Sequence, residues 1–239
     1  MAALAILLTL TVFWAATPGV AWADENVVYR LKWLFNVSTA GDLYADVNGL
    51  FTAEGLAVTV KPGGPERDAI KELELGYAQF GVASADQVIR ARAKGARVVV
   101  LAQLFQINPL QWIYLPDRGK LKALVDLKGR KIGITYGGND ETIMRALLAK
   151  YNITEDQVTL YSVRYDYTPF YQGKVDLWPL YRNAQAPIIG EKLRKAGEQF
   201  DLMSPSRLGI RFVANSVITT QKMVDERPET VKRFVTALM

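Results

Sequence analysis

The sequence predicts an α/β protein of two lobes that are built around largely parallel sheets. Apolar runs rich in valine, isoleucine and aromatic residues alternate with amphipathic stretches, which is the pattern of repeated βα units. Asn108-Pro109 interrupts this alternation, and an extended segment over residues 112–115 resumes it, so we expect a crossing into a second lobe there. Residues 209–214 are the expected return crossing, because a strand-like run and then a helical run follow them.

Four strands separated by three helices are expected in the first lobe. Thr39, with Asp42 three residues later, is expected to cap the first helix, and Ser84 with Gln87 forms a capping box for the third. Pro65 is expected at the first position of the second helix. The strands are predicted over residues 28–34, 56–60, 80–83 and 98–105, and the helices over residues 40–51, from Pro65 to Gly76, and from Ser84 to Gly95.

The second lobe is expected to repeat the pattern with shorter elements. The spacing of Ile143 and Leu147 indicates a helix after the glycine-containing turn at residues 136–139. The strands are predicted over residues 131–135 and 159–163 with a short helix over 167–172, and after the return crossing a strand over 217–220 and a helix over 228–239.

The composition excludes several classes of site. The chain has no cysteine and no histidine, which excludes disulfides, thiol nucleophiles, the usual zinc sites and histidine-dependent triads. Asp86, Asp140 and Asp176 could border a cleft, but the sequence does not fix the distances between these carboxylates, so we predict no catalytic residue, no metal ligand and no cofactor. The net charge of +5 is spread as single lysines and arginines among acids, so no basic run is dense enough to follow a phosphate backbone, and nucleic acid is not an expected partner.

Residues 1–23 are interpreted as a signal peptide. They carry no charged side chain, contain the apolar run of residues 4–13, and end in Ala21-Trp22-Ala23, a small-x-small pattern that predicts cleavage before Asp24. The alternative is an uncleaved membrane anchor, but the helix-breaking pair Pro18-Gly19 fits a signal peptide better. Without a cysteine there is no lipidation site, so we expect a free periplasmic protein if the source is a bacterium with two membranes.

Several motifs together resemble those of a known family. They include Trp33-Leu34-Phe35-Asn36, Glu54-Gly55-Leu56, Gly63-Gly64-Pro65, residues 81–85, Asp126-Leu127-Lys128-Gly129 and Ile218-Thr219-Thr220, with Pro228 and Phe234. These motifs extend over nearly all of residues 27–238. As a set they resemble the solute-binding proteins for thiamine pyrimidine precursors, which are related to the binders of nitrate, sulfonate and taurine.

The resemblance implies a type II periplasmic-binding-protein fold, in which two extended crossings join the lobes and the ligand lies between them. We place lobe 1 at residues 24–107, lobe 2 at 108–211 and the return to lobe 1 at 212–239. The resemblance also implies hinge closure on a small-molecule ligand, delivery to an ABC permease in the inner membrane, and a monomer. Family members usually continue beyond the equivalent of Met239, so we expect this chain to lack a C-terminal part.

Candidate ligand contacts lie where strands end and helices begin, because loops converge and backbone N–H groups point outward there. Aromatic side chains would bury a planar ligand and amides would orient it, although each aromatic side chain has packing beneath a loop as its alternative, and each asparagine a turn. The candidates are Trp33, Asn36, Thr39, Gly64, Ser84, Ala85, Asp86, Asn108, Tyr136, Gly138, Trp178, Tyr181, Asn183 and Gln185.

The expected ligand is neutral or weakly basic and planar. Carboxylates in the first turns, at Asp42, Asp86, Asp140 and Glu141, would offset the helix dipoles that bind anions, unless these groups only face solvent. Two departures from the pyrimidine-binding pattern leave the ligand open, because the family often has His where Thr39 stands and Asn-Glu-Pro near residues 183–187.

Three other functions compete with this interpretation. The first is a binder of a small anion such as nitrate, sulfonate or taurine, and the second is the ligand-sensing domain of a receptor. The third is an enzyme similar to thiamine pyrimidine synthase, which by resemblance would use iron, pyridoxal phosphate and a histidine of its own chain. A chain without histidine lacks a required part of that chemistry.

Overall fold

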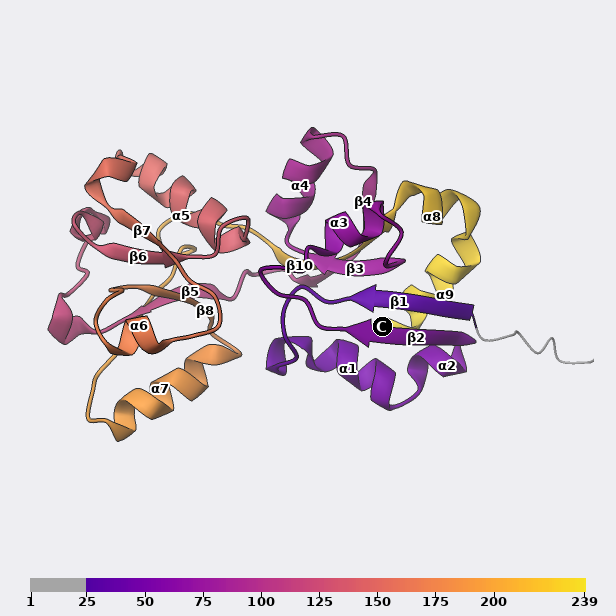
Figure 1. Ribbon diagram of the computed structural model, residues 1–239, viewed down its shortest axis with the longest axis horizontal. Helices are drawn as coiled ribbons and strands as arrows, with labels where there is room; N and C mark the ends of the chain where they lie inside the picture. Colours follow the sequence, from indigo (N-terminus) through magenta and orange to yellow (C-terminus); the bar gives the residue numbers. More distant parts are fainter. Residues whose placement is uncertain (1–24) are drawn as a thin grey trace, which may run out of the picture.

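The computed structural model describes residues 25–239, which form two lobes side by side (Figure 1). The predicted signal peptide, its cleavage before Asp24 and the alternative of a membrane anchor lie outside these residues. Within residues 25–239, no helix has the length and apolar character needed to cross a bilayer.

The first lobe is organised around a five-stranded sheet in the order β2-β1-β3-β10-β4. The neighbours of β1 run parallel to it, whereas β10 runs antiparallel to both β3 and β4. A strand from the end of the chain therefore lies between two strands from its beginning. The bounds are Glu25–Arg30 for β1, Leu56–Lys61 for β2, Phe80–Ala83 for β3, Val98–Phe105 for β4 and Ala214–Thr220 for β10.

Helices cover both faces of this sheet (Figure 1). Residues from α1, α2 and α9 pack in one core around Phe234, and residues from α3 and α4 pack in another around Ile218. The helices are α1 (Ala40–Val47), α2 (Leu50–Ala53), α3 (Ala69–Glu74), α4 (Ala85–Ala93), α8 (Gln221–Glu226) and α9 (Pro228–Leu238), with a 3-10 helix at Val37–Thr39.

The structure corrects two helices predicted in this lobe. The helix expected over residues 40–51 is two helices, because Gly49 adopts a left-handed conformation with φ of 69° between them. The helix expected from Pro65 begins only at Ala69, since the Asp68 side chain caps it by accepting from the Ile70 N–H at 2.9 Å. Pro65 therefore lies in the preceding loop.

The second lobe contains a three-stranded sheet in the order β8-β5-β9 and a two-stranded parallel sheet of β6 and β7. The sequence analysis did not predict β9 or helix α7. The strands are β5 (Leu110–Tyr114), β6 (Lys131–Ile134), β7 (Thr159–Ser162), β8 (Trp178–Tyr181) and β9 (Asp201–Met203), and the helices are α5 (Asn139–Lys150), α6 (Thr168–Tyr171) and α7 (Gln185–Lys195), with 3-10 helices at Pro116–Arg118, Leu124–Leu127 and Glu155–Gln157.

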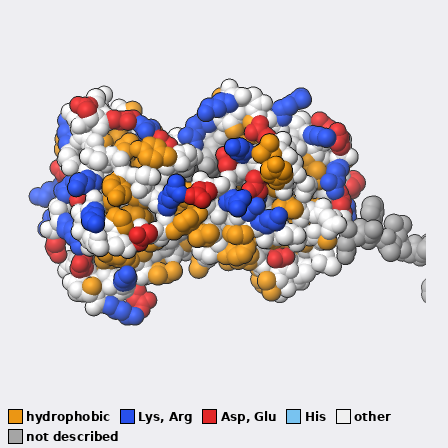
Figure 2. All heavy atoms as spheres, in the orientation of Figure 1, with side chains coloured by type: hydrophobic (Ala, Val, Ile, Leu, Met, Phe, Trp, Pro, Cys, Tyr) orange, Lys and Arg blue, Asp and Glu red, His pale blue; other side chains and the backbone are white. Residues whose placement is uncertain are grey.

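Two segments connect the lobes and run next to each other. The Asn108 N–H donates to the Phe212 carbonyl at 3.2 Å, which joins the outgoing segment to the returning one. The Asn108 side chain accepts from the Leu110 N–H at 3.0 Å and so fixes the start of β5. Figure 2 shows a waist at this junction with hydrophobic side chains on both sides of it.

Candidate functional site

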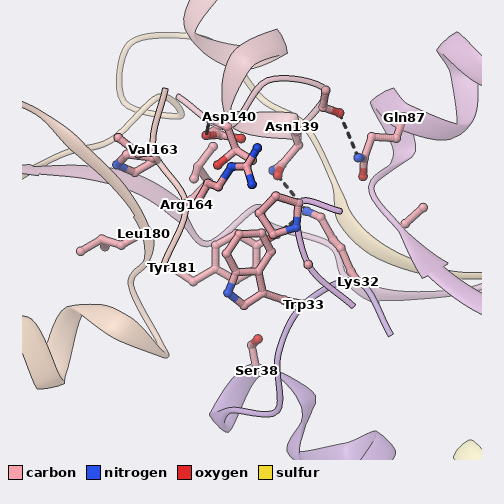
Figure 3. Close-up of a pocket in the computed structure, with 18 of the residues that line it drawn as sticks. Lys32, Trp33, Ser38, Gln87, Asn139, Asp140, Val163, Arg164, Leu180 and Tyr181 are labelled. Atoms are coloured by element: carbon pink, nitrogen blue, oxygen red, sulfur yellow. Dashed lines mark hydrogen bonds between the residues drawn. The ribbon is translucent and has the colours of Figure 1, made fainter. Parts of the chain in front are cut away.

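The candidate site is a cleft between the two lobes, lined by residues of both (Figure 3). The first lobe contributes the loop after β1, the loop after β2 and the end of β3. The second contributes the loops after β6 and β7 and strand β8. These are carboxyl ends of strands, where the side chains of consecutive loops converge in an α/β sheet.

Half of the candidate residues line this cleft, and their role in binding stays a prediction. The lining residues are Trp33, Gly64, Tyr136, Gly138, Trp178, Tyr181 and Gln185. The other candidates, which are Asn36, Thr39, Ser84, Ala85, Asp86, Asn108 and Asn183, are not among the residues that line it.

Most of the polar candidates outside the cleft bond to nearby groups of the protein. The Asn36 side chain accepts from the Ser38 N–H at 2.7 Å, and the Thr39 hydroxyl donates to the Asn36 carbonyl at 2.9 Å. Asp86 pairs with Arg90 at 3.4 Å on the same helix. Short polar side chains at turns and caps commonly form such local bonds, and the sequence alone does not separate that role from ligand binding.

Trp33 lines the cleft, and its ring contacts the opposite lobe. It is partly exposed, and its ring lies 5.5 Å from the ring of Tyr165 in the other lobe. Trp178, in contrast, is only 2% exposed and packs against Tyr167 and Phe170 in the core of the second lobe. Packing therefore dominates at Trp178, which borders the cleft without presenting a free ring face.

Gly64 permits the close approach of the two lobes beside Trp33. A Cβ atom added at this position would lie 2.0 Å from the Tyr165 hydroxyl oxygen, and the Gly64 φ of 147° is rarely adopted by residues with a side chain. The glycine thus leaves room for Tyr165, a residue that sequence analysis did not select.

Lys32 is the most connected polar residue of the cleft, and sequence analysis missed it. Its ammonium group donates to the Ser84 hydroxyl at 2.6 Å, to the Asn139 amide oxygen at 2.8 Å and to the Tyr181 hydroxyl at 2.8 Å. Ser84 belongs to the first lobe and the other two acceptors to the second, so the lysine joins the lobes. Figure 3 shows its amino group next to Asn139. Its place directly before Trp33 was the only signal available.

Asp140 is the one of the four first-turn carboxylates that lines the cleft. It is 5% exposed and accepts from the Thr135 N–H at 2.5 Å. Burial raises the pKa of Asp140 to about 6, and the Thr135 hydrogen bond and the positive charge of Lys32 partly offset this rise.

The other three first-turn carboxylates are not among the residues that line the cleft, and each bonds to another group of the protein. Asp42 accepts from the Tyr29 hydroxyl at 2.6 Å, and burial raises the pKa of Asp42. Glu141 accepts from the Gly137 N–H at 2.7 Å, while Asp86 pairs with Arg90. The expected electrostatic effect on a ligand therefore depends on Asp140 alone among these four.

Two arginines also line the cleft. Arg164 forms an ion pair with Glu66 of the other lobe, and Arg67 is exposed. Within the described residues, no group of three acidic side chains is arranged to hold a metal ion.

Comparisons with known proteins are consistent with this architecture. A model of the family described as NMT1/THI5 like matches residues 36–239. A Haemophilus influenzae protein named as a thiamine biosynthesis protein is 26% identical over 161 residues, which are 65% of this chain and 50% of that protein. The riboflavin-binding protein RibY of Chloroflexus aurantiacus is 24% identical over 230 residues, which are 93% of this chain and 63% of RibY.

The fold is that of periplasmic binding proteins. The alkanesulfonate-binding protein SsuA from Xanthomonas axonopodis pv. citri, solved with bound MOPS, superposes with a TM-score of 0.66 at 20% identity and covers 90% of this chain and 73% of SsuA. The predicted α/β periplasmic-binding fold is thereby confirmed. The chain spans between 50 and 63% of the length of the two curated relatives above.

Proposed function

The chain belongs to the NMT1/THI5-like family, and from this membership we propose that it is a periplasmic solute-binding protein of an ABC importer. In this proposal, the cleft captures a small planar heteroaromatic molecule, and closed lobes present it to a permease in the inner membrane. The protein binds and releases its ligand without chemical change.

The observation that carries the proposal is that one cleft draws its lining from both lobes. Trp33 and Lys32 come from the first lobe, and Asn139 and Tyr181 from the second. A ligand that contacts both sides favours the closed arrangement, because it gains contacts there that the open arrangement lacks. A cleft between two lobes can therefore close on a ligand and open again to release it.

A heteroaromatic ligand is supported by the side chains of the cleft and by the names of two relatives. Trp33, Tyr136 and Tyr167 offer aromatic surface on which a flat ring can stack. The ring system of riboflavin, which RibY is named for, and the pyrimidine part of thiamine are both planar nitrogen heterocycles. Stacking with a few orienting hydrogen bonds would serve either ring.

A small anion such as nitrate, a sulfonate or taurine is the second candidate. Arg67 lines the cleft with an exposed side chain, and the structural relative SsuA is named for alkanesulfonates. The buried carboxylate of Asp140 in the same cleft opposes an anion, and Arg164 is already paired with Glu66. These two features favour the heteroaromatic candidate.

Lys32 is held in the cleft by three hydrogen bonds. Its side-chain nitrogen donates to oxygen acceptors on Ser84, Asn139 and Tyr181. This geometry supports a binding role for the residue.

Isothermal titration of the purified chain with a panel of compounds would test the proposal. The panel contains riboflavin, 4-amino-5-hydroxymethyl-2-methylpyrimidine, nitrate, taurine and an alkanesulfonate. We expect saturable binding of at least one heterocycle, and Trp33→Ala should weaken it by about tenfold, since the loss of one stacked aromatic side chain typically costs on the order of 1–3 kcal/mol.

Tyr77→Ala is the matched control, because Tyr77 is 67% exposed and is not among the cleft-lining residues. Its affinity for the heterocycle should equal that of the unaltered chain. If only the anions of the panel bind, the ligand is a small anion rather than a heteroaromatic molecule. A folded chain that binds no member of the panel would contradict the proposed function.

A further inference from the structure

We propose that Lys32 and Asn139 make the floor of the cleft selective for a neutral carbonyl group of the ligand and unfavourable for an amino group at the same place. This inference rests on the proposed function and narrows its ligand class. Two groups carry it: the Lys32 ammonium, which makes three hydrogen bonds, and the Asn139 Nδ2, which makes none.

The Lys32 ammonium group has no proton left for a ligand. Its three acceptors, on Ser84, Asn139 and Tyr181, lie within 2.6 to 2.8 Å. The Tyr181 hydroxyl in turn donates to the Asn215 side chain at 3.2 Å, so this acceptor is fixed as well. A lysine held from three sides acts on the ligand through its charge and through the groups that it orients.

Asn139 is the group that Lys32 orients. Because its amide oxygen accepts from Lys32, the NH₂ end of the amide is directed elsewhere. Its Nδ2 atom is buried without a hydrogen-bond partner, the residue is 5% exposed, and it lines the cleft. A buried amide donor without a partner is costly, and an acceptor atom of a ligand in the cleft would remove this cost.

The position of Asn139 favours the same kind of ligand atom. It is the first residue of α5, a helix of 12 residues whose N-terminus carries partial positive charge. An amino group of a ligand beside Asn139 would face the positive end of the helix, the Lys32 ammonium and the Asn139 amide, which is also a donor. A carbonyl oxygen would instead accept from Asn139 with the dipole aligned.

Asp140 explains why a full negative charge is not required. Its buried carboxylate follows Asn139 in α5. Burial raises the pKa of Asp140 to about 6, and the positive charge of Lys32 opposes part of this rise. The two charges therefore act on each other and offset one another locally. The Asp140 carboxylate thus offsets part of the positive charge at the floor of the cleft, which favours a neutral carbonyl over an anion.

A pair of probes that differ in one group would test this selectivity. The first is 4-amino-5-hydroxymethyl-2-methylpyrimidine, and the second is its 4-oxo analogue, in which a carbonyl replaces the amino group; riboflavin is titrated as a larger carbonyl-bearing probe. By calorimetry, we expect the full chain to bind the oxo probe at least about tenfold more tightly than the amino probe.

Asn139→Asp keeps the acceptor for Lys32 and removes the free donor. We expect it to weaken binding of the oxo probe and riboflavin by about tenfold or more and to abolish the preference between the paired probes. Lys32→Met, which frees the amide to rotate, should also abolish the preference. Asn183→Asp makes the same charge change on an exposed residue outside the cleft lining and should alter nothing. Thermal melting verifies that each variant is folded.

The outcomes separate this inference from the proposed function. The selectivity would be overturned if the amino probe bound as tightly as the oxo probe or more tightly. It would also be overturned if a folded Asn139→Asp chain bound the oxo probe as the unaltered chain does. In either case the proposal that the chain binds a heteroaromatic ligand would stand. A chain that binds none of the heterocycles would overturn both.

Discussion

Lys32, Asn139 and Asp140 hold each other in place on the floor of the cleft. Lys32 donates to Asn139, and its charge acts on Asp140, which also accepts from the Thr135 backbone. Each bond restrains a side chain that would otherwise sample several rotamers, so the polar groups are positioned before a ligand arrives. At the scale of single residues, binding specificity and folding stability therefore depend on the same bonds.

The stability of the fold should depend on the protonation of Asp140. Its pKa in the folded state is about 6 and exceeds the ordinary value of 3.8, so the folded state binds the proton more tightly than the unfolded state. The stabilising contribution is complete below pH 3.8 and is lost as the pH rises through 6. The difference amounts to about 3 kcal/mol in the free energy of unfolding.

Asp140→Asn should remove this dependence, because the amide keeps an acceptor for the Thr135 N–H and does not titrate. Urea unfolding between pH 4 and pH 7 would measure it as the difference between the variant and the unaltered chain. Asp225→Asn, at an exposed site, is the control. Parallel pH profiles of the unaltered chain and Asp140→Asn would contradict the prediction.

At the scale of elements, the last helix completes the core of the first lobe. Phe234 of α9 is fully buried, stacks on Phe80 of β3 at 3.7 Å between ring centroids, and lies 5.3 Å from Phe51 of α2. Strand β10, which helix α8 separates from α9, lies between β3 and β4. The C-terminal 26 residues from Ala214 to Met239 thus hold together elements formed by the first 105.

Phe234→Ala should destabilise the chain by about 3–5 kcal/mol, because it leaves a cavity in a stacked aromatic cluster. Urea unfolding at neutral pH would measure this loss as a shift in the transition midpoint. Lys232→Ala on the same helix is the matched control, since its side chain is exposed and is not part of the core cluster around Phe234. A loss no larger than that of the control would show that α9 is dispensable for this lobe.

At the scale of the whole molecule, contacts across the cleft hold the lobes together. They include the ring contact of Trp33 with Tyr165, the ion pair of Glu66 with Arg164, and the bonds of Lys32. The Gln87 side chain also donates to the Gly137 carbonyl at 3.2 Å (Figure 3). Most of these contacts lie at the cleft itself, so hinge opening would expose the same residues that we propose bind the ligand.

Gly64→Ala should weaken the contact between the lobes. The added methyl group would meet the Tyr165 hydroxyl, and the left-handed φ would be strained by at least about 1 kcal/mol. We expect a larger radius of gyration by small-angle X-ray scattering and several-fold weaker binding of whichever heterocycle the chain takes. Gly41→Ala is the control, because a Cβ there meets no atom within 4 Å. Unchanged scattering and affinity would contradict the role of Gly64.

Local sequence patterns predicted most elements, because the periodicity of a strand and the position of a glycine can be seen in a short stretch of sequence. Strands β3 and β4 have the predicted bounds, and α9 begins at the predicted Pro228. The errors also have local causes, such as the capping of α3 by Asp68 rather than a start at Pro65. Strand β9 has three residues, and β5 is its one partner among the strands of residues 25–239, so its stability comes from a distant segment rather than from its own sequence.

The sequence by itself determined the α/β class, the exclusion of cysteine and histidine chemistry, and the aromatic character of the cleft around Trp33. Tertiary structure alone decided which polar groups meet there. Lys32 and Asn139 are 107 residues apart, and their bond exists only because two lobes approach each other. The tertiary structure likewise decided that Trp178 is buried in the core of the second lobe and that Asp140 lines the cleft. Burial and pairing depend on atoms contributed by distant segments, which no local pattern records.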